Sequence, residues 1–349
     1  MNAILGIVFA PFFGGSQVNA GAFFLNLQAP LWAALTVFPI YLIGREIGDR
    51  RTGLIAAIIF PFLPATINES IFGYANYLSF YTFIILIVIY AYLRTLKAVG
   101  SRRWVSSYRD RKAIVAGFRG FLRTERTAVK WAVFTGVSFG ALALAWQGYT
   151  YAVAVIGVFI VLVMIIERIR RVDSFGVWFA TVIVGVVGFP LAMPYYYFQG
   201  EFAGWFDLPL LLFFGSLLLL VPFLFMRDLP WVISIPTLFG VFAAAAAGLF
   251  VVEPGYFTNI VTGQGYFIKT LIYSTVAEAQ SPSFDTLVIS YGVITFFLAF
   301  VGLGLIVWTL VRGRFQRWLL FFLIFAGVSL YLPFSASKFL LLGAPAFAL

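Results

Sequence analysis

The sequence predicts an all-α, multi-pass membrane protein with about 11–12 transmembrane helices, and three observations support this prediction. Of its 349 residues, 62% are hydrophobic and only 10% are charged, whereas about a quarter of the residues of an ordinary soluble domain are charged. The hydrophobic residues are grouped in runs long enough to cross a bilayer as helices. The basic residues fall almost entirely in alternate connections between these runs.

The apolar runs extend along the whole chain, and we expect residues 1–349 to form one transmembrane domain. They lie at about 20–44, 53–67, 78–97, 131–147, 149–166, 175–198, 208–226, 229–252, 286–311 and 318–334, and another begins near 339. Met1–Phe13 is apolar but short, and it lacks the charged start and the cleavage site of a signal peptide. We interpret it as a partial span or an interfacial helix.

The distribution of charge gives the topology. If the connection at 45–51 is cytoplasmic, all but two of the 23 Lys and Arg residues fall in cytoplasmic connections, and the two exceptions are Lys269 and Lys338. The longest basic connection, 94–130, has apolar residues at helical spacing. It is predicted to hold an amphipathic helix on the inner leaflet, and the alternative is a solvated basic loop. The lipid bilayer is therefore the expected partner, and no nucleic acid is expected.

The residue types present limit the chemistry. The chain has no Cys and no His, which excludes disulfides, Cys/His zinc sites, thiol nucleophiles and histidine acid–base catalysis. No predicted span carries a charged residue at its centre, and this disfavours a transporter or flippase. Carboxylates, amides and hydroxyls remain, with a hard cation that prefers oxygen ligands.

Polar residues gather in two external connections. One is 68–77, and the other is a long external loop, 253–285, which carries Glu278. A loop of this length is usually functional or disordered. Position alone indicates only that Glu278 is a solvated charge.

Several motifs, in order along nearly the whole chain, resemble the catalytic subunit of archaeal and eukaryotic oligosaccharyltransferase. Thr275–Glu278 is similar to the Thr-Ile-x-Glu motif of that family's fifth external loop, and Ser70–Gly73 resembles the entry to its second. The other resembling segments are Pro30–Val37, Tyr41–Glu46, Gly53–Ala57 with Pro64, Ala145–Tyr151, Ser337–Phe339 and Ala344–Leu349. The chain resembles the membrane domain of this family, truncated at both ends.

The resemblance implies a GT-C glycosyltransferase that moves a glycan from a polyprenyl-(pyro)phosphate lipid of the dolichol type to the Asn amide of Asn-x-Ser/Thr in an acceptor protein. It implies that Glu278 is catalytic and that Asn76 and Glu278 bind Mn²⁺ or Mg²⁺. Thr275, Tyr77 and Lys338 are the implied substrate-binding residues. The implied location is the cell membrane, in archaea the plasma membrane, with the catalytic loops on the external face.

Two departures from the family pattern leave alternatives open. In the second external loop, Asn76 and Leu78 stand where the family has an acid and a Glu or His. No Asp-x-Asp-like stretch occurs in residues 1–44. One alternative is a non-catalytic paralogue that binds lipid-linked glycan, and another is a different GT-C enzyme acting on lipid-linked sugars. For the active enzyme, we expect the Glu278 carboxylate to face Asn76 in one cavity at the lipid headgroup level.

Overall fold

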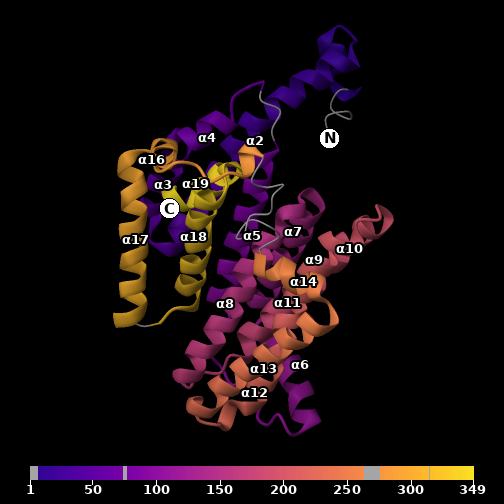
Figure 1. Cartoon of the computed structure of the whole chain (residues 1–349), viewed down its shortest axis with the longest axis vertical. Coiled ribbons are helices and arrows are strands. Elements are labelled where there is room, and N and C mark those ends of the chain that lie inside the picture. The colour runs from indigo at the N-terminus through magenta and orange to yellow at the C-terminus, as the bar shows by residue number, and fades with distance from the viewer. Residues whose placement is uncertain (1–6, 74–76, 263–275, 314) are drawn as a thin grey trace. The chain divides into compact units, whose positions relative to one another are not determined.

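The computed structural model describes residues 7–73, 77–262, 276–313 and 315–349, and every regular element within these ranges is a helix. The all-α prediction is confirmed. The chain forms two compact units, which are described separately (Figure 1). Unit 1 comprises Met1–Leu86, Ala277–Gly304 and Ser329–Leu349, and unit 2 comprises Ile87–Val276 and Leu305–Val328.

Unit 1 is built from short and long helices of both chain ends. Its elements are η1 (Ala10–Phe13), α2 (Gln17–Ile47), α3 (Arg50–Phe62), α4 (Pro64–Glu69), η4 (Ala277–Ala279), α16 (Phe284–Tyr291), η5 (Ser337–Phe339) and α19 (Leu340–Ala348). Parts of α5 (Leu78–Ala98), α17 (Val293–Arg312) and α18 (Arg317–Ser335) belong to each unit.

Unit 2 contains the middle of the chain. Its remaining elements are α6 (Arg111–Thr124), α7 (Arg126–Ala145), η2 (Gln147–Tyr149), α8 (Thr150–Ile169), α9 (Phe175–Phe198), α10 (Phe202–Trp205), α11 (Asp207–Leu219), α12 (Val221–Phe225), η3 (Met226–Asp228), α13 (Trp231–Val252) and α14 (Pro254–Thr262).

Nine helical segments within the described ranges are long and apolar enough to cross a membrane. They are Gln17–Ile47, Leu78–Ala98, Arg126–Ala145, Gln147–Ile169, Phe175–Phe198, Asp207–Asp228, Trp231–Val252, Val293–Arg312 and Arg317–Ser335. Each corresponds to a predicted apolar run. The predicted number of 11–12 also counted shorter apolar segments, which the structure shows as the shorter helices η1, α3 with α4, and α19.

Two of the predicted runs are interrupted for local reasons. The run at 53–67 divides at Leu63, which has an extended conformation (φ −66°, ψ 129°) because the residue before a proline is disfavoured in the helical region, and Pro64 follows. The run at 286–311 divides at Gly292, where φ is +75°.

The core of unit 1 depends on close backbone approach. An added Cβ on Gly44 of α2 would lie 2.8 Å from the Cα of Gly53 in α3, so only glycine allows this contact. Nearby, the Asp49 carboxylate accepts a hydrogen bond from the Thr52 amide at 2.8 Å and caps α3.

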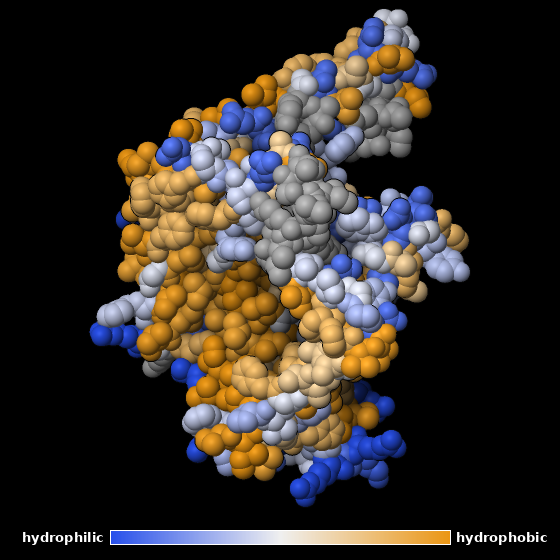
Figure 2. Space-filling view, viewed as in Figure 1, coloured by the Kyte–Doolittle hydropathy of each residue, from blue (hydrophilic) through white to orange (hydrophobic). Residues whose placement is uncertain are grey.

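Unit 2 packs α7 along α9, with a core of aromatic rings between them and α11. Two tyrosine hydroxyls in this core donate hydrogen bonds to backbone carbonyls. Tyr149 donates to Trp205 O at 3.0 Å, and Tyr196 donates to Ala143 O at 2.8 Å. Much of the visible surface is apolar, and hydrophilic residues gather at the end of unit 2 where α6 and α12 lie (Figures 1 and 2).

The basic connection 94–130 contains a helix, α6, where the apolar spacing predicts one. Part of its apolar face packs against protein. The Phe118 ring lies 4.5 Å from that of Phe179 in α9, and Phe121 is fully buried. Val115 and Leu122 remain about half exposed, and their contact with the inner leaflet stays a prediction.

A buried ion pair joins α8 to the start of α18. The guanidinium of Arg317 donates through Nε to Glu167 Oε1, and both side chains are almost fully buried. Arg317 also donates through Nη1 to Val99 O at 3.2 Å, so it connects the ends of α5, α8 and α18. An ion pair in this environment is costly to break, because the remaining partner stays buried and charged.

We expect Arg317→Leu to lower the free energy of unfolding by about 3 kcal/mol, because it leaves Glu167 charged or protonated without a partner. Thermal unfolding in detergent, followed by tryptophan fluorescence, measures the effect. Arg312→Gln removes an exposed arginine and serves as the control. Equal unfolding temperatures for the two variants would contradict a structural role for the pair.

Candidate functional site

Glu278 lies on a short 3₁₀ turn, η4, with its side chain exposed. The next residue, Ala279, is buried, and the Gln280 amide donates to Ala277 O at 3.2 Å and closes the turn. The turn therefore has a buried side that anchors it and an exposed side that presents the carboxylate.

Hydrogen bonds fasten this turn to the segment that precedes α19. The carbonyl oxygen of Gln280 accepts from both the amide and the hydroxyl of Ser337, at 2.9 and 3.0 Å. The Ser281 hydroxyl donates to Ser335 O at 3.2 Å. Glu278 and Lys338, which are far apart in the sequence, therefore lie on adjoining turns.

Lys338 is half-buried, and its Nζ lies 5.2 Å from the centroid of the Phe339 ring. The apolar stem of a lysine packs readily while its ammonium group stays in contact with water. Lys338 thus places a positive charge beside the turn that carries Glu278.

Helices α16 and α19 follow the two turns in the chain and pack against each other. The Tyr291 ring of α16 stacks on Phe347 of α19 at 3.7 Å, and its hydroxyl donates to Leu340 O at 2.7 Å. Helix α4 packs against both α16 and α19, as their labels in Figure 1 show. The end of α4, where the external connection 68–77 begins, therefore belongs to the same end of unit 1.

Tyr77 directly precedes α5 in the same unit. Its carbonyl accepts from the Tyr81 amide, and its exposed ring stacks on Tyr81 with centroids 6.4 Å apart. The Ser79 hydroxyl donates to Glu69 O at 3.4 Å and connects the start of α5 to the end of α4.

The structure thus joins the turns of two predicted site residues, Glu278 and Lys338, and places Tyr77 in the same unit. Asn76 and Thr275 lie outside the described residues. The expected meeting of Glu278 with Asn76 therefore stays a prediction. Sequence reasoning missed Ser281, Ser335 and Ser337, although serines at the end of an apolar run are a signal for hydrogen bonds to a neighbouring turn.

The described parts of the predicted long loop, residues 253–262 and 276–285, contain regular elements. They contain α14 (Pro254–Thr262) and η4, and α16 begins at Phe284. Helix α14 is tied to the start of α11 because the Tyr256 hydroxyl donates to the Asp207 carboxylate. This hydrogen bond, which requires the protonated hydroxyl, raises the pKa of Tyr256.

The described residues do not by themselves form a divalent metal site. Among them, no group of three or more Asp, Glu, His or Cys side chains is close enough to hold an ion. A hard cation such as Mg²⁺ needs about six oxygen ligands in octahedral geometry, and one exposed carboxylate does not supply them. A metal held at Glu278 would therefore need further ligands from water, from substrate or from other parts of the chain.

The long apolar helices, with polar turns at their ends, define an all-α multi-pass membrane protein. The archaeal oligosaccharyltransferase AglB from Archaeoglobus fulgidus, solved with an inhibitory peptide and a dolichol-phosphate, has the same fold. The TM-score is 0.78 at 18% identity, and the match covers 99% of this chain and 40% of that chain.

The chain belongs to the oligosaccharyl transferase STT3 family, because the family's N-terminal model matches residues 22–339. It is 30% identical over 149 residues to the dolichyl-monophosphooligosaccharide–protein glycotransferase AglB of Haloferax volcanii. That match covers 41% of this chain and 13% of the relative.

A further structure of the Archaeoglobus fulgidus enzyme, tethered to an acceptor peptide containing the NVT sequon, has a TM-score of 0.73 at 18% identity over 99% of this chain and 39% of that chain. Another, in complex with zinc and sulfate, has a TM-score of 0.62 at 16% identity over 99% and 38%. This chain spans well under two thirds of the length of the proteins that it resembles.

We expect Gly343→Ala to destabilise the support beneath the Glu278 turn by about 1–3 kcal/mol, as overpacking does in other cores. An added Cβ at Gly343 in α19 would lie 2.4 Å from Pro333 Cγ and 2.7 Å from Tyr291 Oη. Gly327→Ala, in α18, is the control, because no described neighbouring atom lies within 4 Å of its added Cβ. Thermal unfolding that is unchanged in both variants would show that α19 is not packed as described.

Proposed function

We propose that this chain carries the transfer site of an oligosaccharyltransferase, which moves a glycan from a polyprenyl-(pyro)phosphate lipid to the side-chain amide of Asn in Asn-x-Ser/Thr. The observation that carries the proposal is the pair of adjoining turns that present Glu278 and Lys338, found in a chain of the STT3 family. The peptide and dolichol-phosphate in the Archaeoglobus fulgidus structures support both substrates.

The reaction forms a bond between the Asn amide nitrogen and the anomeric carbon, while the bond from that carbon to the phosphate oxygen breaks. The bonding electrons leave with the phosphate, and the amide nitrogen gives its proton to a base, either the Glu278 carboxylate or the departing phosphate. An exposed carboxylate at Glu278 can accept a hydrogen bond from the amide NH₂ group and orient its nitrogen for attack. The ammonium group of Lys338 can stabilise the negative charge of the lipid phosphate as a point charge.

The other proposed roles rest on the family resemblance. Tyr77, with its exposed ring, and Thr275 are proposed to contact substrate. Asn76 and Glu278 are proposed ligands of Mn²⁺ or Mg²⁺, and the zinc in one Archaeoglobus fulgidus structure supports a divalent ion. We place the site on the external face of the cell membrane, the plasma membrane in an archaeon, because the charge partition puts both Glu278 and Lys338 outside.

The alternative functions are a non-catalytic paralogue that binds lipid-linked glycan and a different GT-C enzyme that uses lipid-linked sugars. The first is favoured by Asn76 and Leu78, which replace acidic or ligating residues of the family pattern. Leu78 is the first residue of α5, where an apolar side chain needs no functional explanation.

We expect Glu278→Gln in the full-length protein to reduce glycan transfer by about 100-fold, because a neutral amide orients the acceptor NH₂ group poorly and cannot take a proton. The assay follows transfer from a lipid-linked oligosaccharide to a fluorescent Asn-x-Thr peptide in the presence of Mn²⁺. Glu253→Gln removes another exposed external glutamate, at the end of α13, and we expect it to keep wild-type turnover.

Wild-type turnover by Glu278→Gln would contradict the assignment of the site. A wild-type protein that binds lipid-linked oligosaccharide without transferring it would support the non-catalytic alternative. Transfer of the sugar to an acceptor other than the peptide would support the other GT-C enzyme.

A further inference from the structure

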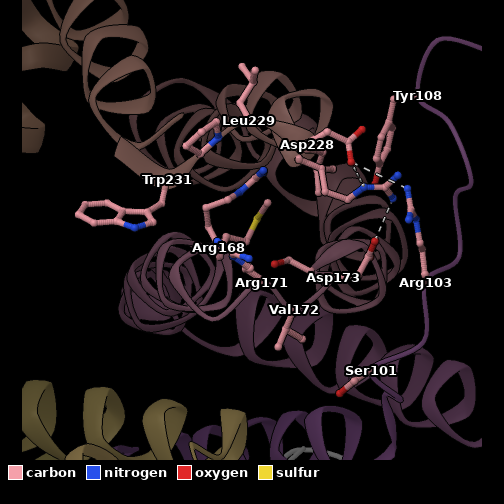
Figure 3. Close-up of a pocket in the computed structure, with 15 residues that line it drawn as sticks. Ser101, Arg103, Tyr108, Arg168, Arg171, Val172, Asp173, Asp228, Leu229 and Trp231 are labelled. Atoms are coloured by element: carbon pink, nitrogen blue, oxygen red, sulfur yellow. Dashed lines mark hydrogen bonds and ion pairs between the residues drawn. The ribbon is translucent and has the colours of Figure 1, made fainter. Parts of the chain in front are cut away.

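Unit 2 contains a cavity of about 770 Å³, and its lining includes none of the residues proposed for glycan transfer (Figure 3). Its walls come from the loop after α5, the end of α8 with the turn that follows, the end of α12 with η3, and the first turn of α13. The charge partition assigns all of these connections to the cytoplasmic side. The cavity therefore lies at the inner surface of the membrane.

Positive charge exceeds negative charge in the walls of this cavity. The lining includes four arginines and two aspartates: Arg103, Arg168, Arg171, Arg227, Asp173 and Asp228. Figure 3 shows Arg103, Tyr108 and Asp228 on one side of the cavity and Trp231 on the other.

Arg168 and Arg227 are half-buried. Asp228 lies 3.6 Å from Arg227 and 3.9 Å from Arg103, so the two aspartates offset only part of the charge of the four arginines. Arg227 Nη1 lies 3.2 Å from Asp173 Oδ2, and the guanidinium also donates to carbonyls of the 101–110 loop. Arg168 donates to the carbonyls of Met226 and Phe223, which satisfy its hydrogen-bonding groups without cancelling its charge. An anion in the cavity would meet a net positive field.

Arg171 is held in an unusual conformation at the edge of the cavity. Its φ is +57°, the left-handed region in which glycine is favoured, and it ends α8 with the Val172 amide donating to Glu167 O at 2.9 Å. A residue with a Cβ costs about 1 kcal/mol in this conformation. Its side chain is exposed, and none of the side-chain hydrogen bonds or ion pairs between described residues involves it. A left-handed residue is common directly after a helix end, and here it carries a side chain that lines the cavity.

Two further groups of donors line the cavity. The Tyr108 hydroxyl is buried without a hydrogen-bond partner among the described residues, and burial raises the pKa of Tyr108 so that the hydroxyl keeps its proton. Helix α13 begins at Trp231 after Pro230, with no side-chain cap. The Ile233 amide already donates to Pro230 O at 3.0 Å. The amides of Trp231 and Val232 and the positive dipole end are therefore the groups available to an anion.

The start of α13, whose first residue lines the cavity, is apolar and exposed. Trp231, Val232 and Ile233 are each more than half exposed, and only 6% of the hydrophobic window of α13 is buried. A side this apolar lies against acyl chains in a bilayer. A phosphate in the cavity and a hydrocarbon chain along α13 are therefore compatible with a single ligand.

We propose that this cavity is a binding site for the phosphate headgroup of an anionic membrane lipid in the inner leaflet. Arg171, the Tyr108 hydroxyl and the first turn of α13 supply the donors, and the exposed start of α13 receives the chains. Basic cavities between helices on the cytoplasmic side are suited to such headgroups. The proposal is independent of the external site at Glu278.

The test uses the full-length protein in an uncharged detergent and measures the dissociation constant for dioctanoyl phosphatidic acid by isothermal titration calorimetry. We expect Arg171→Gly to weaken binding by about tenfold, as loss of a charge-assisted hydrogen bond does. Because glycine adopts a φ of +57° without strain, this variant should unfold at or above the wild-type temperature. Tyr108→Phe, which changes no charge, should weaken binding about threefold.

The control is Arg170→Gln, which removes an equal charge from the neighbouring residue. Arg170 does not line the cavity, and its guanidinium lies 5.4 Å from the centroid of the Phe315 ring. We expect the dissociation constant of Arg170→Gln for phosphatidic acid to stay near that of the wild type. Dioctanoyl phosphatidylcholine, which has no net charge, should not compete with phosphatidic acid for the cavity. Equal weakening by Arg170→Gln and Arg171→Gly would overturn the site. Inorganic phosphate that binds as tightly as the lipid would overturn the assignment to a lipid headgroup.

Discussion

The bilayer interior offers no hydrogen-bonding partner to the backbone, and this constraint determines where the chain can place polar chemistry. Each span satisfies its amides and carbonyls internally as a helix. Apart from carbonyls freed by prolines inside spans, such as Pro190 and Pro194 of α9, the backbone groups without a helical partner lie at the ends of the spans. The turn of Glu278 and the cavity beside Arg171 both lie at helix ends. The apolar composition and the position of the candidate sites are two results of the same constraint.

Hydrogen bonds to backbone carbonyls near helix ends also position the candidate transfer site. The carbonyl of Gln280 accepts two hydrogen bonds from Ser337, and the hydroxyl of Ser281 donates to Ser335 O. A short 3₁₀ turn has little cooperative stability of its own. The orientation of the Glu278 carboxylate therefore depends on the packing of α16 against α19, the helices that follow the two turns.

The spans could be predicted from the sequence, because hydrophobic length is a local property. Their orientation, inferred from the distribution of Lys and Arg, stays a prediction. The helix break at Leu63 is caused by the proline that follows it, and the break at Gly292 accompanies a positive φ. How these breaks change the number of spans can be read only from the structure. The contact between Gln280 and Ser337, the buried pair of Glu167 and Arg317, and the basic cavity join residues distant in the chain. No periodic pattern encodes such contacts. Glu278 could be singled out only through resemblance to a family.

The most direct test of the central claim is a disulfide between the two turns. The chain has no native Cys, so Gln280→Cys with Ser337→Cys introduces the only pair of thiols. Because the Ser337 amide and the Gln280 carbonyl are 2.9 Å apart, the two Cα atoms lie in the range that a disulfide spans. We predict that the pair crosslinks in the membrane under mild oxidation, while Gln280→Cys alone, which has no second thiol in the chain, forms no crosslink within the chain. A Gln280–Ser337 pair that remains reduced under the same conditions would contradict the account.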